Sequence, residues 1–114
     1  GGNKQIFINK EELRHALMRA SALFSEKQRG VRFNISQGNL KILAHNSEQD
    51  EVEEDLSVDY VGDEIDVSFN AKYVIDYLNI VKAEQVKLTL SDSNSGVLLE
   101  GDENGVYVLM PMRI

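Results

Sequence analysis

The chain has no cysteine among its 114 residues. This absence excludes a disulfide scaffold, a zinc site with cysteine ligands and a thiol nucleophile. No apolar stretch is long enough to span a bilayer, and no basic start followed by an apolar middle marks a signal peptide. We therefore expect a cytoplasmic protein that does not enter a membrane.

Positive charge is also scarce. Lys and Arg number 12 against 19 Asp and Glu, which gives a net charge of -7. A domain that grips nucleic acid by itself needs clustered cations to neutralise phosphates, so strong autonomous DNA binding is not expected. A hydrophobic content of 42% lets one domain of this length bury a core without disulfides or metal. We expect residues 1–114 to form a single domain of a longer protein, with residues 1–2 left from a tag.

Two segments have the periodicity of amphipathic helices, and each follows an asparagine that can cap it, Asn9 or Asn70. The apolar side of the first is made by Leu13, Ala16, Leu17, Ala20, Leu23 and Phe24, and that of the second by Val74, Tyr77, Leu78 and Val81. Both helices are therefore expected to pack on other elements.

Strand patterns fill most of the remaining chain. Residues 30–46 predict a hairpin around a turn at 37–39, residues 51–60 a half-buried strand, and residues 85–101 a second hairpin around a turn at 92–96. Asn104 and Gly105 then turn the chain into a final strand. The count is about eight strands and two helices.

This order of elements repeats. Residues 6–17 can be laid over residues 67–78, which matches Asn9 with Asn70. Each half reads strand, helix and three strands. We expect an α+β fold of two pseudo-symmetric β-α-β-β-β halves, with both helices on one face of a continuous antiparallel sheet.

No pattern indicates catalysis or a cofactor. His15 and His45 lack the spacing of a metal motif and are expected to be surface residues. Residues 92–96 resemble only the start of a calcium loop, and a hairpin turn explains them better. No nucleotide-binding or nucleophile motif occurs. The sequence therefore predicts neither an enzyme nor a cofactor.

The acidic run at residues 47–55 has three interpretations. It can be a solvated face, which the residues alone favour, or an edge strand that like charges protect from self-pairing until a basic partner strand arrives. It can also be a metal site. Strand alternation separates Glu51, Glu53 and Asp55 from Glu54, so the carboxylates form a strip rather than a cage.

The last eight residues carry a single charge. Alternation directs Val106, Val108, Met110, Met112 and Ile114 one way and Tyr107, Leu109, Pro111 and Arg113 the other. Pro111 cannot donate to a ladder, so strand pairing should fail near it. On the residues alone, a buried core strand with methionine as filler is slightly favoured over a surface that adapts to a partner.

Three segments, GVYVLMPMRI, QRGVRF and FNAKYVIDYL, closely resemble the C-terminal domain of the bacterial DNA sliding clamp, the β subunit of DNA polymerase III. The likeness covers essentially the whole chain. It implies a DNA polymerase processivity factor rather than an enzyme. In that family three such domains form a subunit, and two subunits close into a homodimeric ring around duplex DNA.

The resemblance also implies three sets of site residues. A hydrophobic pocket would take short linear motifs of replicative and repair polymerases and of the clamp loader. Its residues would be Asn70, Tyr73, Val108, Met110, Pro111, Met112 and Arg113. A further wall position of the family falls on Asn94, and the preceding domain supplies part of the pocket.

The implied subunit interface makes a paired edge the preferred interpretation of the acidic run. Its residues would be Leu23, Gln28, Glu48, Asp50, Glu51 and Glu54. Loose DNA contacts, without sequence preference, would come from Arg14, Arg19, Lys72 and Lys82. Two other hypotheses remain: a peptide-binding module that forms no ring, and a metal-dependent enzyme that uses the acidic strip.

Overall fold

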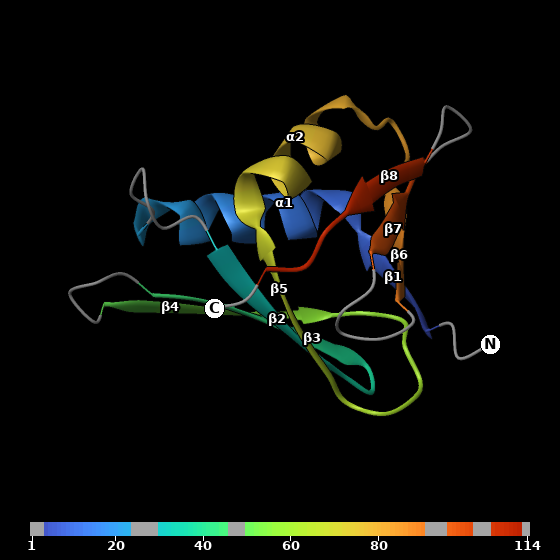
Figure 1. Ribbon diagram of the computed structural model, residues 1–114, viewed down its shortest axis with the longest axis horizontal. Coiled ribbons are helices and arrows are strands. Elements are labelled where there is room, and N and C mark those ends of the chain that lie inside the picture. The colour runs from blue at the N-terminus through green and yellow to red at the C-terminus, as the bar shows by residue number, and fades with distance from the viewer. Residues whose placement is uncertain (1–3, 24–29, 46–49, 91–95, 102–105, 113–114) are drawn as a thin grey trace.

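A computed structural model describes residues 4–23, 30–45, 50–90, 96–101 and 106–112 (Figure 1). These residues form eight strands and two α-helices, as the sequence predicts, together with one short 3-10 helix. In chain order the elements are β1 (Lys4–Asn9), α1 (Lys10–Ala20), η1 (Ser21–Leu23), β2 (Gly30–Ser36), β3 (Asn39–His45), β4 (Glu51–Ser57), β5 (Ile65–Asn70), α2 (Ala71–Ile80), β6 (Gln85–Leu90), β7 (Val97–Glu100) and β8 (Val106–Leu109).

The strands form two antiparallel sheets, in the orders β1-β6-β7-β8 and β4-β3-β2-β5. Each sheet therefore contains one strand from the other half of the chain. The expected continuous sheet is wrong: among the described residues, single bridges join Phe7 to Asp59 and Ser68 to Met112. The segments that follow β4 and β8 thus each pair with the other sheet at one residue only, so no ladder joins the two sheets in the part of the chain that the structure describes.

The internal repeat is confirmed in the arrangement of the two halves. Each half contains a strand, a helix and three strands. The side chain of Asn9 accepts a hydrogen bond from the Glu12 amide at 2.9 Å, and Asn70 accepts one from the Lys72 amide at 3.0 Å. Both helices therefore begin at the predicted caps, which satisfy amides that have no partner inside the helix.

The helices lie together on one side of the molecule and cover the core (Figure 1). The predicted apolar side of α2 is buried, as are the first four apolar residues of α1. Leu23 is half-buried in η1 rather than part of α1, and Phe24 lies outside the described residues. The α-helix stops at Ala20 because Ser21 caps it and its hydroxyl donates to the Met18 carbonyl.

The turn between β2 and β3 is hydrogen-bonded to the segment that connects the two halves of the chain. The predicted turn at 37–39 is formed by Gln37 and Gly38, with Gly38 at a φ of 74°. The Gly38 amide donates to the Tyr60 carbonyl at 3.1 Å, and the Val58 amide donates to the Gly38 carbonyl at 3.2 Å. The strand expected at 51–60 ends at Ser57, where this docked connection begins.

Candidate functional site

A pocket of about 320 Å³ lies where the start of α2 meets β8 and the residues that follow it. It is lined by Asn70, Tyr73, Tyr107, Val108, Leu109, Met110 and Met112. Most of these side chains are apolar, and only Asn70 and the tyrosines bring hydrogen-bonding groups. This composition is that of a site that takes apolar side chains and orients them with a few polar contacts.

The two faces of β8 have different roles. Leu109 is only 4% exposed and belongs to the core, and Tyr107 stacks on Tyr77 of α2 with ring centroids 5.4 Å apart. Val108 and Met110 point outward and are 56% and 67% exposed. The interpretation of the tail as a buried strand with methionine filler is therefore wrong, because its methionines lie on the surface.

Beyond β8 the chain crosses from one sheet to the other. Pairing with β7 ends at Leu109, as predicted from Pro111. The Met112 amide then donates to the Ser68 carbonyl of β5 at 2.7 Å. This hydrogen bond fixes Met112 beside the start of α2 and closes one side of the pocket.

Asn70 serves both the fold and the pocket. Its side-chain oxygen caps α2, so this oxygen is already engaged, whereas the amide nitrogen can still donate to a ligand. Next to it, Tyr73 presents an exposed ring and hydroxyl. Lys72 lies 6.0 Å from the centroid of that ring and pairs with Asp76 at 3.0 Å. Capping therefore leaves Asn70 as a hydrogen-bond donor toward the pocket.

Comparison with known families supplies the identity of this fold. Residues 1–113 match the family described as the DNA polymerase III beta subunit, C-terminal domain. The chain belongs to this family.

The beta sliding clamp of Pseudomonas putida is 46% identical over 116 residues, a match that covers all of this chain and 32% of that protein. The crystal structure of the DNA polymerase sliding clamp of Pseudomonas aeruginosa is 43% identical with a TM-score of 0.93, and covers 100% of this chain and 32% of that one. A sliding clamp of P. aeruginosa bound to griselimycin has a TM-score of 0.92 at 43% identity, over 100% and 31% of the two chains.

The chain thus spans about a third of the length of these relatives. The α+β clamp fold expected from the sequence is confirmed. The relatives named here are sliding clamps. No helix in the described part of the chain is both long and apolar enough to cross a membrane.

The structure brings together most of the pocket residues that the clamp resemblance implied. Asn70, Tyr73, Val108, Met110 and Met112 line one cavity, and Pro111 lies between the two methionines without lining it. Arg113 and Asn94 lie outside the described residues. Sequence reasoning missed the inward-facing Tyr107 and Leu109, because the pocket runs over the end of the strand and therefore meets both of its faces.

The acidic strand β4 is an edge of its sheet, as one interpretation of the run required. Glu51, Glu53 and Asp55 are exposed. Glu54 lies on the helix side, where Arg19 donates to its Oε1 from Nε at 2.9 Å and from Nη2 at 2.7 Å. The hydrogen bonds and charge of Glu54 raise the pKa of the Arg19 guanidinium.

The structure describes two of the four other predicted interface residues. Leu23 lies in η1 and Asp50 immediately precedes β4, whereas Gln28 and Glu48 lie outside the described residues. The carboxylates of β4 point to two faces, and no group of three His, Asp or Glu side chains within the described ranges could hold a metal ion. The geometry therefore gives no support to a metal-dependent enzyme.

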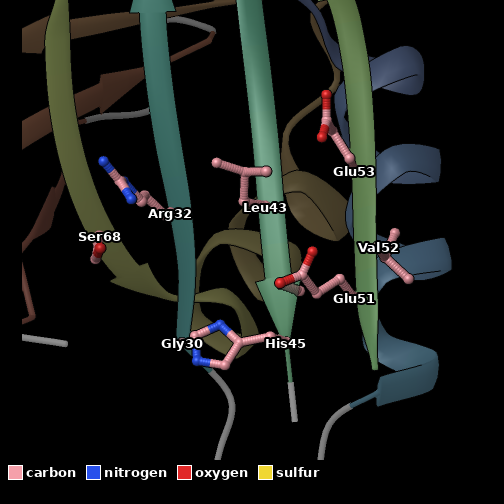
Figure 2. A pocket seen from close by; sticks show the side chains of 9 residues that line it. Gly30, Arg32, Leu43, His45, Glu51, Val52, Glu53 and Ser68 are labelled. Carbon is pink, nitrogen blue, oxygen red and sulfur yellow. The ribbon is translucent and has the colours of Figure 1, made fainter. Parts of the chain in front are cut away.

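The sheet of β2 to β5 has a second hollow on its outward face, with a volume of about 510 Å³. Figure 2 shows Arg32, His45 and Glu51 on three neighbouring strands of this sheet. Two charged residues that line the hollow form ion pairs: Arg32 pairs with Asp66 at 3.0 Å, and Glu53 pairs with Lys41 at 3.1 Å. Arg32 holds the pKa of Asp66 below its usual value, chiefly through hydrogen bonds.

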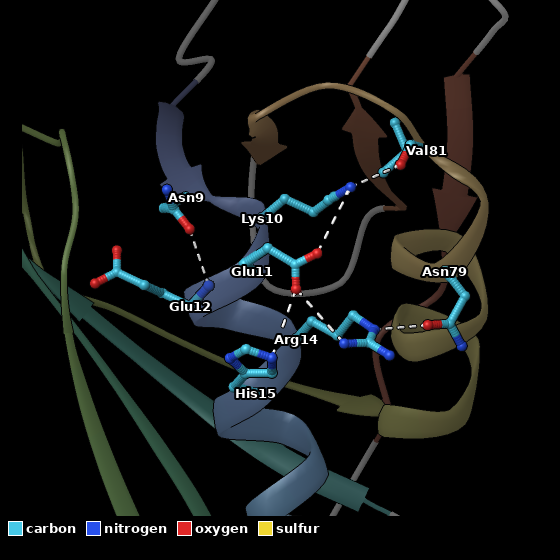
Figure 3. Close-up of polar contacts among 8 residues, drawn as sticks. All are labelled: Asn9, Lys10, Glu11, Glu12, Arg14, His15, Asn79 and Val81. Atoms are coloured by element: carbon cyan, nitrogen blue, oxygen red, sulfur yellow. Dashed lines mark hydrogen bonds and ion pairs between the residues drawn. The ribbon is translucent and has the colours of Figure 1, made fainter.

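The cations predicted to face DNA are balanced by nearby polar groups. On α1, Arg14 lies 3.5 Å from Glu11 and donates to Asn79 of α2 at 2.7 Å (Figure 3). Arg19 binds Glu54 and Lys72 binds Asp76. Lys82 is exposed just after α2. This helical surface is therefore not a concentrated positive patch, which agrees with the negative net charge.

Proposed function

We propose that this chain is a domain of a DNA polymerase processivity factor that recruits its partners through the pocket between α2 and β8. The observation that carries the proposal is the set of outward side chains Val108, Met110 and Met112 around an apolar cavity. Soluble proteins expose grouped apolar side chains mainly where they bind something. The family to which the chain belongs makes a clamp the natural setting for such a site.

The chemistry of the pocket favours a short linear peptide. Thioether side chains are flexible and polarizable, so Met110 and Met112 can adapt to leucine-like side chains. The Asn70 amide can donate to a peptide carbonyl or a glutamine side chain, and the Tyr73 hydroxyl can donate or accept. A related clamp has been solved with griselimycin bound, which supports ligand binding in this family. The proposed partners are motifs of replicative and repair polymerases and of the clamp loader.

The edge strand β4 supports the proposal that the domain is part of a ring. β4 ends its sheet with an exposed row of carboxylates, which suits pairing with a basic strand and opposes pairing with itself. In the longer chain, with this domain as the last of three, two subunits would close into a homodimeric ring around duplex DNA. Leu23, Gln28, Glu48, Asp50, Glu51 and Glu54 are proposed for the contact.

The proposed action is tethering rather than catalysis. A ring raises the effective concentration of polymerase at DNA without tight contacts. Because Arg14, Arg19 and Lys72 already have acidic partners, their attraction for phosphates should be weak, as sliding requires. Chromosome replication makes the cytoplasm the expected location. A peptide-binding module that forms no ring is the alternative, and the mass of the natural longer protein in solution distinguishes the two.

Methyl-detected NMR tests the pocket directly. The chain has three methionines, of which Met110 and Met112 line the pocket and Met18 lies on α1. Titration with a short peptide containing glutamine and leucine should shift the first two methyl signals in a saturable way and leave Met18 unchanged. The double variant Met110→Ala, Met112→Ala should remain folded and bind much more weakly.

Binding that is undiminished in this double variant would contradict the proposal. If the methyl signals stay in place, the titration is repeated on the longer natural protein, which includes the preceding domain. A second failure to shift Met110 and Met112 would rule out peptide binding at this pocket.

A further inference from the structure

The outward face of the β8 sheet carries an apolar strip that extends beyond the pocket. It consists of Leu98, Val106, Val108 and Met110. Leu98 on β7 is the cross-strand partner of Val108, and Val106 precedes Val108 by two residues on the same face. Leu98 and Val106 are 38% and 51% exposed. Neither residue lines the pocket.

The strip and the pocket are one continuous surface, since Val108 and Met110 belong to both. Gly96 allows this continuity. A Cβ atom at Gly96 would lie 3.2 Å from Cγ1 of Val108 and 3.4 Å from Sδ of Met110. Without that atom, the Met110 thioether lies close against the start of β7, and among the described residues the strip continues directly into the pocket through Val108 and Met110.

Polar residues limit the width of the strip. Glu100, opposite Val106, pairs with Lys87 at 3.7 Å, and Thr89 lies opposite Leu98. The apolar strip is therefore two strands wide at Leu98 and Val108 and one strand wide at Val106. A narrow strip of this kind matches one extended peptide better than the broad face of a globular partner.

We propose that the peptide held in the pocket continues over β8 and places a further apolar side chain on Leu98 and Val106. This inference rests on the proposed function, because it assigns a second contact to the same ligand. It predicts that the partner segments contain an apolar residue outside the part that fills the pocket.

Paired peptides test the proposal. One short peptide with glutamine and leucine is extended by two leucines or by two serines, first at one end and then at the other. With the parent chain, leucine at one of the two ends should bind roughly five- to tenfold tighter than serine, because it buries the exposed part of Leu98 and Val106.

The variant Leu98→Thr, Val106→Thr should lose this advantage. Threonine keeps strand propensity, and both positions are exposed, so the variant should fold. The matched control Val61→Thr, Ile80→Thr changes two other exposed apolar residues outside the strip and should keep the advantage. Thermal unfolding of both variants confirms that they are folded.

The outcomes separate the two proposals. Equal affinity for leucine and serine extensions at both ends, or an advantage that survives Leu98→Thr, Val106→Thr, would overturn the inference and leave the pocket intact. The strip would then have another occupant, such as a neighbouring domain or a second copy. If no peptide binds the parent chain or the longer natural protein, the proposed function fails and the inference fails with it.

Discussion

Tyr60 shows how a single residue secures the connection between the halves. It is 4% exposed, its hydroxyl donates to the Asp63 carbonyl at 2.7 Å, and its ring covers Gly62. A Cβ atom at position 62 would lie 2.6 Å from the Tyr60 hydroxyl, at a φ of 154°. Glycine is therefore required there both by the close approach and by the backbone conformation. Burial, followed by the Asp63 charge, raises the pKa of Tyr60.

This raised pKa predicts a loss of stability in alkali. Above about pH 10 the unfolded tyrosine ionises while the folded one remains protonated, so stability decreases as the pH rises through the pKa of the folded state. In the variant Tyr60→Phe, the contribution of this ionisation to the alkaline loss of stability should be absent. The lost hydrogen bond should lower the free energy of unfolding by roughly 1 kcal/mol at neutral pH. Urea unfolding at neutral and alkaline pH measures both effects. A stability difference between parent and variant that is the same at both pH values would contradict the argument.

At the scale of elements, alternate side chains of β8 have different roles. Those that point inward stabilise the fold, and those that point outward are proposed to bind the peptide. Leu109→Ala removes buried methyl groups and should destabilise the fold by about 2–5 kcal/mol. Val108→Ala changes an exposed side chain and should alter stability by no more than about 0.5 kcal/mol, yet weaken peptide binding. Denaturant unfolding and the peptide titration, applied to both variants, compare the two. Equal destabilisation would show that Val108 also belongs to the core.

Local signals in the sequence were sufficient for the helices and most strands. Asn9 and Asn70 act on amides two or three residues away, and the alternation along β2 or β8 is visible in the residues themselves. The division into two sheets could not be predicted in this way, because it depends on β1 and β5 each joining the strands of the other half. The contact of Arg19 with Glu54 and the place of Tyr107 in the pocket likewise depend on how distant elements pack.

At the scale of the whole molecule, this exchange of first strands links the halves. β1 pairs with β6 and β5 pairs with β2, so neither half contains a complete sheet of its own. We predict that fragments cut after Gly62 do not fold separately and recover structure when mixed. Circular dichroism and thermal unfolding of each fragment and of the mixture test this. A cooperative transition in either fragment alone would contradict it.

The single hydrogen bond from Met112 to Ser68 gives the pocket an unusual position. One wall is built on the β8 sheet, while Asn70 and the bonded carbonyl of Ser68 belong to the strand that ends the other sheet. The cavity therefore lies at the junction between the two sheets. A peptide bound there would contact both sheets. Its binding would therefore stabilise the packing of one sheet against the other, and with it the whole domain, rather than only the surface around the pocket.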